Sequence, residues 1–193
     1  ISRNLLADFS LAQAEIERIA KEGYELDLSN RLRYQVISST FPGVFNLGGD
    51  LELFTQLIRK RDSEALFHYA KSCIDILYAL ATGYNLPITT IALVQGETLG
   101  GGFEAALSAN VIIAERSAKF GFPETVFGMF PGMGAYSFLA RRIAPGMAKR
   151  MITSGKVYTA DELFEMGVID QVVPDGRGIK AVHEYIHHQK IRS

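Results

Sequence analysis

Helical and strand-like patterns alternate along this chain of 193 residues. Apolar residues recur at helical spacing in several segments, and short apolar or alternating runs typical of strands separate many of them. Helices are predicted after Ser10, at 51–60, after Asp62, from Phe103, at 135–143, at 147–153 and after Thr159. Strands are predicted at 32–38, 88–94, 111–114 and 168–173. This alternation of strands and helices predicts an α/β fold.

Polar residues and glycines mark where three of these helices should begin or end. Ser10 is predicted to cap the first helix and Gly23 to end it. Asp62 is predicted to cap a long helix that ends at Gly83. Thr159 has a carboxylate three residues further on, which is the pattern of a capping box.

The stretch GETLGGGFEAALSA at 96–109 carries the most chemical information. It follows the predicted strand 88–94, and Gly100, Gly101 and Gly102 precede the predicted helix. Free N–H groups at a helix start form a small electropositive site, and glycines let a ligand approach the backbone. Glu104 lies just beyond, so this stretch could combine an oxyanion-stabilising site with a general base. A tight turn that packs a helix against a sheet would explain the same glycines.

The residues around these glycines exclude two familiar nucleotide-binding motifs. A phosphate-binding Walker loop needs Gly-Lys-Ser/Thr after the glycines, whereas this chain has Phe103-Glu104. A dinucleotide fingerprint needs GxGxxG near a first strand, which GGGFEA does not supply.

Two further stretches carry candidate chemistry. The segment FPGVFNLGGD at 41–50 is predicted to be a second glycine-bearing turn that leads into a helix. If Gly48-Gly49 and the triple glycine face one cleft, each can give a backbone N–H to the same oxygen. Glu124 follows Pro123 in apolar company, which disfavours the ionised form and suits an acid/base group. An exposed loop glutamate would explain Glu124 as well.

Composition narrows the class of protein. The 20 Lys and Arg residues and 21 Asp and Glu residues give a net charge of −1 with no basic stripe, so nucleic acid is not an expected partner. The apolar runs are too short to span a membrane, and no signal-peptide pattern opens the chain. Cys73 cannot form an internal disulfide and is expected to be a buried thiol. We therefore expect a cytoplasmic protein.

One motif near the end of the chain is treated as a coincidence. The sequence HEYIH at 183–187 matches HExxH, in which two histidines on one helix face bind zinc. A zinc site needs a third protein ligand, and no downstream residue offers one, since His188 points elsewhere and His68 is distant in the sequence. We predict a surface helix and no metal.

In combination, four stretches resemble the crotonase (enoyl-CoA hydratase/isomerase) superfamily. They are VFNLGGDLELF, IALVQGETLGGGFEAALSANVIIAE, KFGFPETVFGMFPGMGAYSFLARRI and SGKVYTADELFEMGVIDQVV, and they cover roughly residues 44–173. Within the superfamily, NLGGDLELF and FPGMGAYSFL are most similar to bacterial synthases of the diffusible signal factor. The resemblance implies a crotonase-like ββα spiral forming one core domain over 1–193.

The resemblance also implies roles for four residues and for a pocket. Gly49 and Gly101 would donate their amides to the thioester oxygen as it becomes an enolate. Glu104 would position and activate water or the leaving hydroxyl, and Glu124 would shuttle the Cα proton. Residues predicted to line the acyl-binding site are Leu47, Gly48, Leu99, Met129 and Met133. Met is adaptable enough to accept different chains, although ordinary core packing would also explain both methionines.

The implied reaction is dehydration of a 3-hydroxyacyl thioester of CoA or acyl carrier protein, followed by hydrolysis to a cis-2-unsaturated acid. No cofactor is implied. An ordinary enoyl-CoA hydratase is one alternative, and a non-catalytic crotonase-fold binding protein is another. Family members begin with one or two more strands and end in helices that cover the acyl site and build trimers. We therefore expect a homo-oligomer, a trimer or a dimer of trimers, and a chain that lacks parts of both ends.

Overall fold

A parallel sheet forms the centre of the computed structural model, which describes residues 1–26 and 31–192. Its spatial order is β1-β3-β5-β8, and every neighbouring pair is parallel. The strands are β1 (Tyr34–Ile37), β3 (Thr89–Val94), β5 (Val111–Glu115) and β8 (Gln171–Val173). β3 and β5 are almost wholly buried, which explains why both read as continuous apolar runs rather than alternating ones. The last strand is shorter than the predicted 168–173.

A second sheet was missed by the sequence patterns. Its order is β2-β4-β6-β7, with β7 antiparallel to β6 and the other pairs parallel. The strands are β2 (Gly43–Asn46), β4 (Gly96–Leu99), β6 (Lys119–Gly121) and β7 (Val157–Thr159). Segments of three or four residues are too short to show a period, and β2 and β4 begin with glycines, so both were predicted to be turns. A Cβ on Gly96 would overlap the backbone of Gly43, so these glycines permit close strand pairing.

The predicted helices form, with corrected boundaries. The helices are α1 (Arg3–Leu26), α2 (Leu51–Lys60), α3 (Ser63–Ala81), α4 (Gly101–Ser108), α5 (Ala135–Leu139), α6 (Pro145–Thr153), α7 (Ala160–Glu165) and α8 (Gly178–Arg192). Two short 3₁₀ helices are η2 (Gly83–Asn85) and η3 (Pro123–Phe127). The first helix starts seven residues before Ser10, whose hydroxyl donates to the Leu6 carbonyl inside the helix, and it continues past Gly23. The Asp62 cap and the Thr159 capping box are confirmed.

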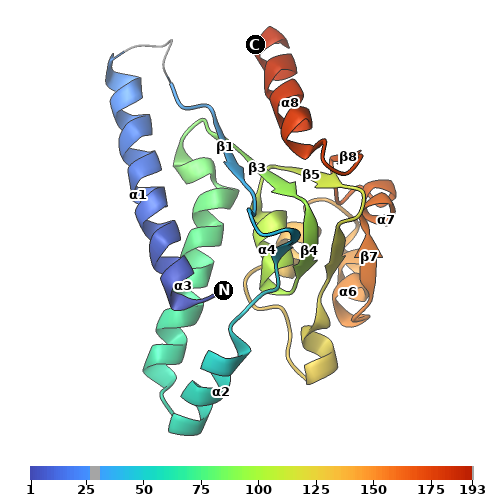
Figure 1. The fold of residues 1–193 in the computed structure, drawn as a ribbon. Coiled ribbons are helices and arrows are strands. Elements are labelled where there is room, and N and C mark those ends of the chain that lie inside the picture. Colours follow the sequence, from blue (N-terminus) through green and yellow to red (C-terminus); the bar gives the residue numbers. More distant parts are fainter. Residues whose placement is uncertain (27–30, 193) are drawn as a thin grey trace.

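Different helices cover the two faces of the parallel sheet. α1 and α3 lie side by side on one flank of the molecule (Figure 1), and α4 contacts α3, α5 and strands of both sheets. α8 covers the opposite face of the parallel sheet, where Ala181 and Val182 pack on Ile91 and Ile113. Helix α4, which carries Glu104, is therefore enclosed between the two sheets and α3.

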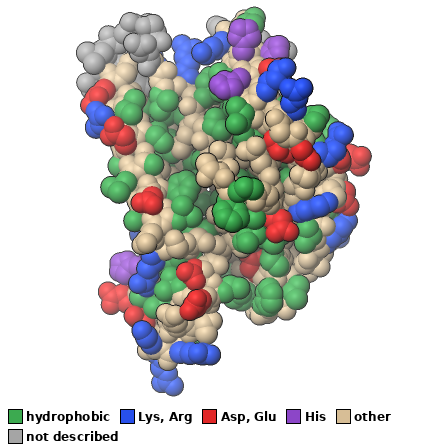
Figure 2. Space-filling model, in the orientation of Figure 1, with side chains coloured by type: hydrophobic (Ala, Val, Ile, Leu, Met, Phe, Trp, Pro, Cys, Tyr) green, Lys and Arg blue, Asp and Glu red, His purple; other side chains and the backbone are tan. Residues whose placement is uncertain are grey.

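The HExxH residues lie on the solvent side of α8. His183, Glu184 and His187 are exposed, which confirms the predicted surface helix. In residues 1–26 and 31–192, no three His, Cys, Asp or Glu side chains are arranged to hold a metal ion. Within the same residues, no helix has the length and apolarity needed to span a membrane. On the face drawn in Figure 2, acidic and basic side chains are interspersed among hydrophobic ones.

Arg142 joins three segments below α4. Its guanidinium group donates to the carbonyl oxygens of Ala109, Asn110 and Val168 at 2.9–3.1 Å and to the Asp170 carboxylate at 2.9 Å. Only 14% of the side chain is exposed. The end of α4 is thus tied to the segment that leads into β8.

We expect Arg142→Ala to lower the free energy of unfolding by about 3 kcal/mol, because it leaves half-buried acceptors without donors. Urea denaturation measures this loss. Arg141→Ala, at the exposed neighbouring position, is the matched control and should change stability by less than about 0.5 kcal/mol. Equal losses in the two variants would contradict the role of Arg142.

Candidate active site

The turn between β4 and α4 requires glycine at two positions. Gly100 has φ +53°, and a Cβ there would overlap the Glu124 carboxylate. A Cβ on Gly102 would overlap the Asn46 carbonyl at the end of β2. The turn is therefore pressed against a neighbouring segment and against a candidate catalytic side chain, which explains why no larger residue fits.

The turn after β2 approaches the same place. Gly48 has φ +92°, and a Cβ there would lie 3.0 Å from the Leu99 carbonyl oxygen and 3.1 Å from the Gly101 nitrogen. The Gly48 N–H donates to the Asn46 side chain at 2.8 Å, and Asp50 caps α2 by accepting from the Leu53 N–H. The two glycine junctions, far apart in sequence, are in contact in the fold.

Both predicted amide donors line one pocket of about 570 Å³. The pocket lies between α2, α3, the start of α4 and the segment 123–133. In the described part of the chain, no hydrogen-bond acceptor occupies the N–H of Gly49 or of Gly101. Both amides are therefore available to a ligand oxygen, although their role as an oxyanion hole stays a prediction.

Glu104 is buried in the first turn of α4, with 1% of its surface exposed. One carboxylate oxygen, Oε1, accepts the N–H groups of Met133 at 2.7 Å and Ala135 at 2.9 Å. Burial is the main cause that raises the pKa of Glu104, to about 7, and the charge of Glu124 adds to it while the two amides oppose it. A carboxyl group with a pKa near 7 can both give and take a proton at neutral pH.

Glu124 enters the same pocket from η3, just after Pro123. Its oxygen Oε2 is buried and has no hydrogen-bond partner among residues 1–26 and 31–192. Burial raises the pKa of Glu124 as well. Of the apolar neighbours that the sequence offers, Phe122 is buried and Phe127 lines the pocket beside Glu124, whereas Val126 is 71% exposed. The walls of the pocket, including Phe127, shield Glu124 from solvent.

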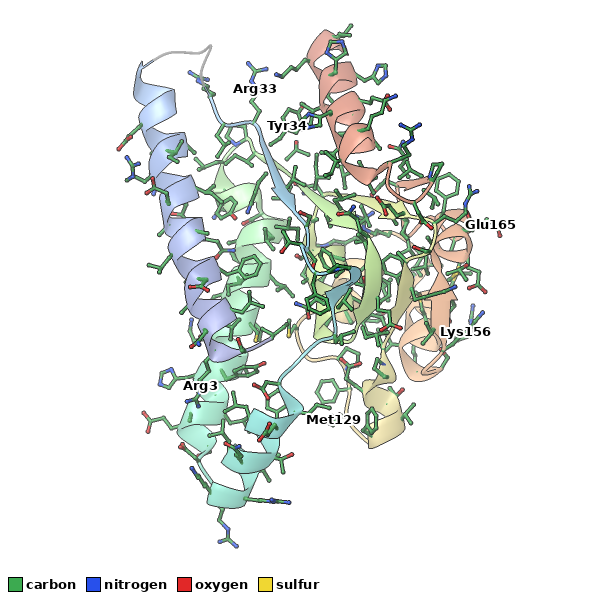
Figure 3. The ribbon with its side chains drawn as sticks, viewed as in Figure 1. Arg3, Arg33, Tyr34, Met129, Lys156 and Glu165 are labelled. Atoms are coloured by element: carbon green, nitrogen blue, oxygen red, sulfur yellow. The ribbon has the colours of Figure 1, made fainter. Side chains whose placement is uncertain are left out.

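The predicted acyl-site residues are mostly brought together. Leu47, Gly48, Met129 and Met133 line the pocket, and Met129 lies between α2 and η3 in the view of Figure 3. Leu99 does not line it. That residue ends β4, where its backbone carbonyl faces Gly48, so the prediction for its side chain is not met.

Sequence reasoning missed Tyr69 and assigned Cys73 to the core alone. Both lie on α3 and line the pocket. Cys73 is buried as predicted, and burial raises the pKa of its thiol. Nothing in the helical spacing of α3 distinguishes a tyrosine facing a pocket from one facing the core.

Comparisons with known proteins agree with this fold. The sequence model described as Enoyl-CoA hydratase/isomerase matches residues 24–188. The chain is 32% identical over 164 residues to human mitochondrial methylglutaconyl-CoA hydratase, covering 85% of this chain and 46% of that protein. It is 33% identical over 148 residues to the putative enoyl-CoA hydratase/isomerase YngF of Bacillus subtilis, covering 77% of this chain and 54% of the relative. The chain spans about half the length of these curated relatives.

Solved structures give the same result. An enoyl-CoA hydratase from Bacillus anthracis superposes with a TM-score of 0.82 at 26% identity, covering 97% of this chain and 66% of that one. Pseudomonas aeruginosa DspI superposes with a TM-score of 0.79 at 26% identity, covering 100% of this chain and 72% of that one. The chain belongs to the enoyl-CoA hydratase/isomerase family.

The raised pKa of Glu104 predicts a pH-dependent stability. The folded state keeps the proton up to about pH 7, whereas the ordinary value is 4.5. The free energy of unfolding should therefore fall as pH rises from about 5 to about 7, by up to about 3 kcal/mol from this group. Urea denaturation across this range measures it.

Glu104→Gln should flatten that decline, because the amide cannot ionise. Glu97→Gln, an exposed position on β4, is the matched control and should retain it. Parallel curves for wild type and Glu104→Gln would show that Glu104 does not have a raised pKa.

Proposed function

We propose that this chain is the core of an acyl-thioester dehydratase and thioesterase that makes a cis-2-unsaturated fatty acid from a 3-hydroxyacyl thioester. The observation that carries the proposal is the pairing of two half-to-fully buried carboxyl groups, Glu104 and Glu124, beside two unoccupied amides in one pocket. The wording NLGGDLELF and FPGMGAYSFL, similar to signal-factor synthases, supports the particular reaction.

In the dehydration, the Glu124 carboxylate takes the proton from Cα as charge accumulates on the thioester oxygen. The N–H groups of Gly49 and Gly101 stabilise that oxygen, and each such donor contributes about 3 kcal/mol in comparable enzymes. The bond from Cβ to the hydroxyl then breaks, and protonated Glu104 supplies the proton that lets water leave. Two acid/base groups thus serve two proton transfers.

The hydrolysis would reuse the same groups. After giving its proton, Glu104 is a carboxylate beside the departing water and can activate a water molecule for attack on the thioester carbon. The tetrahedral oxygen occupies the position of the earlier enolate oxygen, so the amides of Gly49 and Gly101 serve both steps. The thiolate of CoA or of acyl carrier protein leaves and takes up the proton that Glu124 gained from Cα, while Glu104 keeps the proton from the attacking water, so both groups return to their starting states.

The proposal also covers the thioester carrier, the compartment and the oligomeric state. Relatives of this family act on acyl-CoA thioesters, which favours a thioester carrier here. We propose that the complete protein works in the cytoplasm as a homo-oligomer, a trimer or a dimer of trimers, with acyl carrier protein as a second possible carrier.

Glu104→Ala and Glu124→Ala should each lower free-acid formation from 3-hydroxydecanoyl carrier protein at least about tenfold, because each removes one proton-transfer group. Chromatography of the released acid measures the rate. Glu97→Ala is the matched control and should keep wild-type activity, since Glu97 points to solvent on β4. Wild-type rates in both glutamate variants would refute the assigned roles.

The second candidate function is an ordinary enoyl-CoA hydratase, which the two curated relatives favour by name. Crotonyl-CoA hydration and loss of the thioester absorbance, followed in parallel, separate the two. A hydratase forms 3-hydroxybutyryl-CoA and releases no free acid. Binding of acyl thioesters with no turnover in either assay would instead support a non-catalytic binding protein.

A further inference from the structure

Tyr69 lies at the point where α3 meets the turn that carries Gly49. Its hydroxyl accepts the Asp50 N–H at 3.2 Å and donates to the Ile1 carbonyl oxygen at 2.5 Å. Asp50 is the residue after Gly49 and the cap of α2. One phenol group therefore connects α3 directly to the backbone unit next to a candidate oxyanion donor.

The ring of Tyr69 packs against a second aromatic residue. Phe54 meets it edge-on, with ring centroids 5.2 Å apart and planes at 83°. A Cβ on Gly49 would lie 3.0 Å from the Phe54 ring and 3.8 Å from the Tyr69 hydroxyl oxygen. Gly49 is thus enclosed by the ring of one residue and the hydroxyl of the other.

The hydroxyl proton of Tyr69 already forms a hydrogen bond within the protein. A phenol carries one hydrogen, and here that hydrogen is donated to the Ile1 carbonyl. The side chain lines the pocket, yet it has no second hydrogen to offer a substrate oxygen. Burial raises the pKa of Tyr69 to about 12, so the phenol stays protonated across neutral pH. In this arrangement the hydroxyl holds backbone groups together and does not face the pocket as a donor.

From these contacts we infer that Tyr69 is a positioning residue for the reaction: its hydroxyl fixes the Gly49-Asp50 peptide, and this restrains Gly49 from its C-terminal side so that the N–H of the preceding peptide keeps its direction toward the thioester oxygen. The inference rests on the proposed function for the identity of that oxygen. It names Tyr69, on a helix that carries neither glutamate, as part of the machinery of the site.

The requirement is geometric. The Gly101 N–H belongs to the first turn of α4, so the helix fixes its direction. The Gly49 N–H belongs to the Gly48-Gly49 peptide in a turn outside any helix, and the carbonyl of that peptide accepts a hydrogen bond from the Ile1 nitrogen. The Asn46 side chain holds the Gly48 N–H on one side, and Tyr69 holds the Asp50 N–H on the other. Removing one support lets the amide rotate, and small misplacements of this kind cost up to about a hundredfold in rate.

Tyr69→Phe is the decisive variant because it removes only the hydroxyl and keeps the ring against Phe54. We expect kcat for 3-hydroxydecanoyl-CoA to fall about tenfold or more and KM to rise only about threefold, since the acyl pocket remains and the lost interaction is stronger in the transition state. Tyr78→Phe is the matched control on the same helix. Its side chain is 62% exposed, its hydroxyl bonds to no described residue, and activity should be unchanged.

A pair of ligands tests the link to the thioester oxygen. Decanoyl-CoA carries the carbonyl, and S-decyl-CoA has the same chain without it. Stopped-flow mixing measures binding before any turnover. Tyr69→Phe should weaken decanoyl-CoA binding at least about threefold and leave S-decyl-CoA binding unchanged. Equal weakening of both ligands, or of neither, would overturn the inference.

Amide exchange in the wild-type protein provides a test that does not depend on how the variant folds. The Asp50 N–H should exchange with solvent at least about tenfold more slowly in wild type and in Tyr78→Phe than in Tyr69→Phe. An Asp50 amide that exchanges in wild type as fast as an unprotected loop amide would overturn the inference. Wild-type protein that turns over no thioester, while the binding difference persists, would count against the proposed function and leave Tyr69 as a positioning residue for a bound carbonyl.

Discussion

The structure depends on direct backbone contact between two turns that are about fifty residues apart. Gly48 packs against Leu99 and Gly101, and Gly102 packs against the Asn46 carbonyl. Side chains at these positions would separate the turns, and the two candidate amide donors would no longer share a pocket. The second sheet serves this contact, because parallel pairing of β2 with β4 brings both turns to the same edge. The close contact of the turns therefore needs both glycines in the turns and the parallel pairing of β2 with β4.

The sequence was sufficient for the buried parallel strands and for the helices with clear caps. Long apolar runs such as 88–94 and side-chain caps such as Asp62 depend only on residues close in the sequence, so they can be recognised without knowledge of the tertiary structure. The second sheet was not predictable in this way, because strands of three or four residues are too short to show a period and two of them, β2 and β4, begin with glycine. Ser10 failed as a cap because its hydroxyl can also bond to the carbonyl four residues back in a helix interior.

In the candidate site, too, features carried by local motifs were predictable and features that depend on distant contacts were not. Resemblance placed both glutamates and both amides, since motif residues keep their spacing. The pKa of Glu104 depends on burial and on amides from a segment about thirty residues away, which no local pattern encodes. Leu99 was misassigned because its position at the end of β4 leaves its carbonyl, rather than its side chain, at the junction. Tyr69 was missed because its importance lies in a contact between α3 and a distant turn.

The hydrogen bonds to Glu104 connect proton transfer to the shape of the pocket wall. The oxygen that accepts the Met133 and Ala135 amides belongs to the carboxyl group that we propose gives up and regains a proton in the reaction. Amides bind a charged carboxylate more strongly than a neutral acid, so each change of charge alters how firmly the chain around Met133 is held. Met133 itself lines the pocket. In the proposed reaction, the protonation of Glu104 would therefore affect how firmly the pocket wall at Met133 is held.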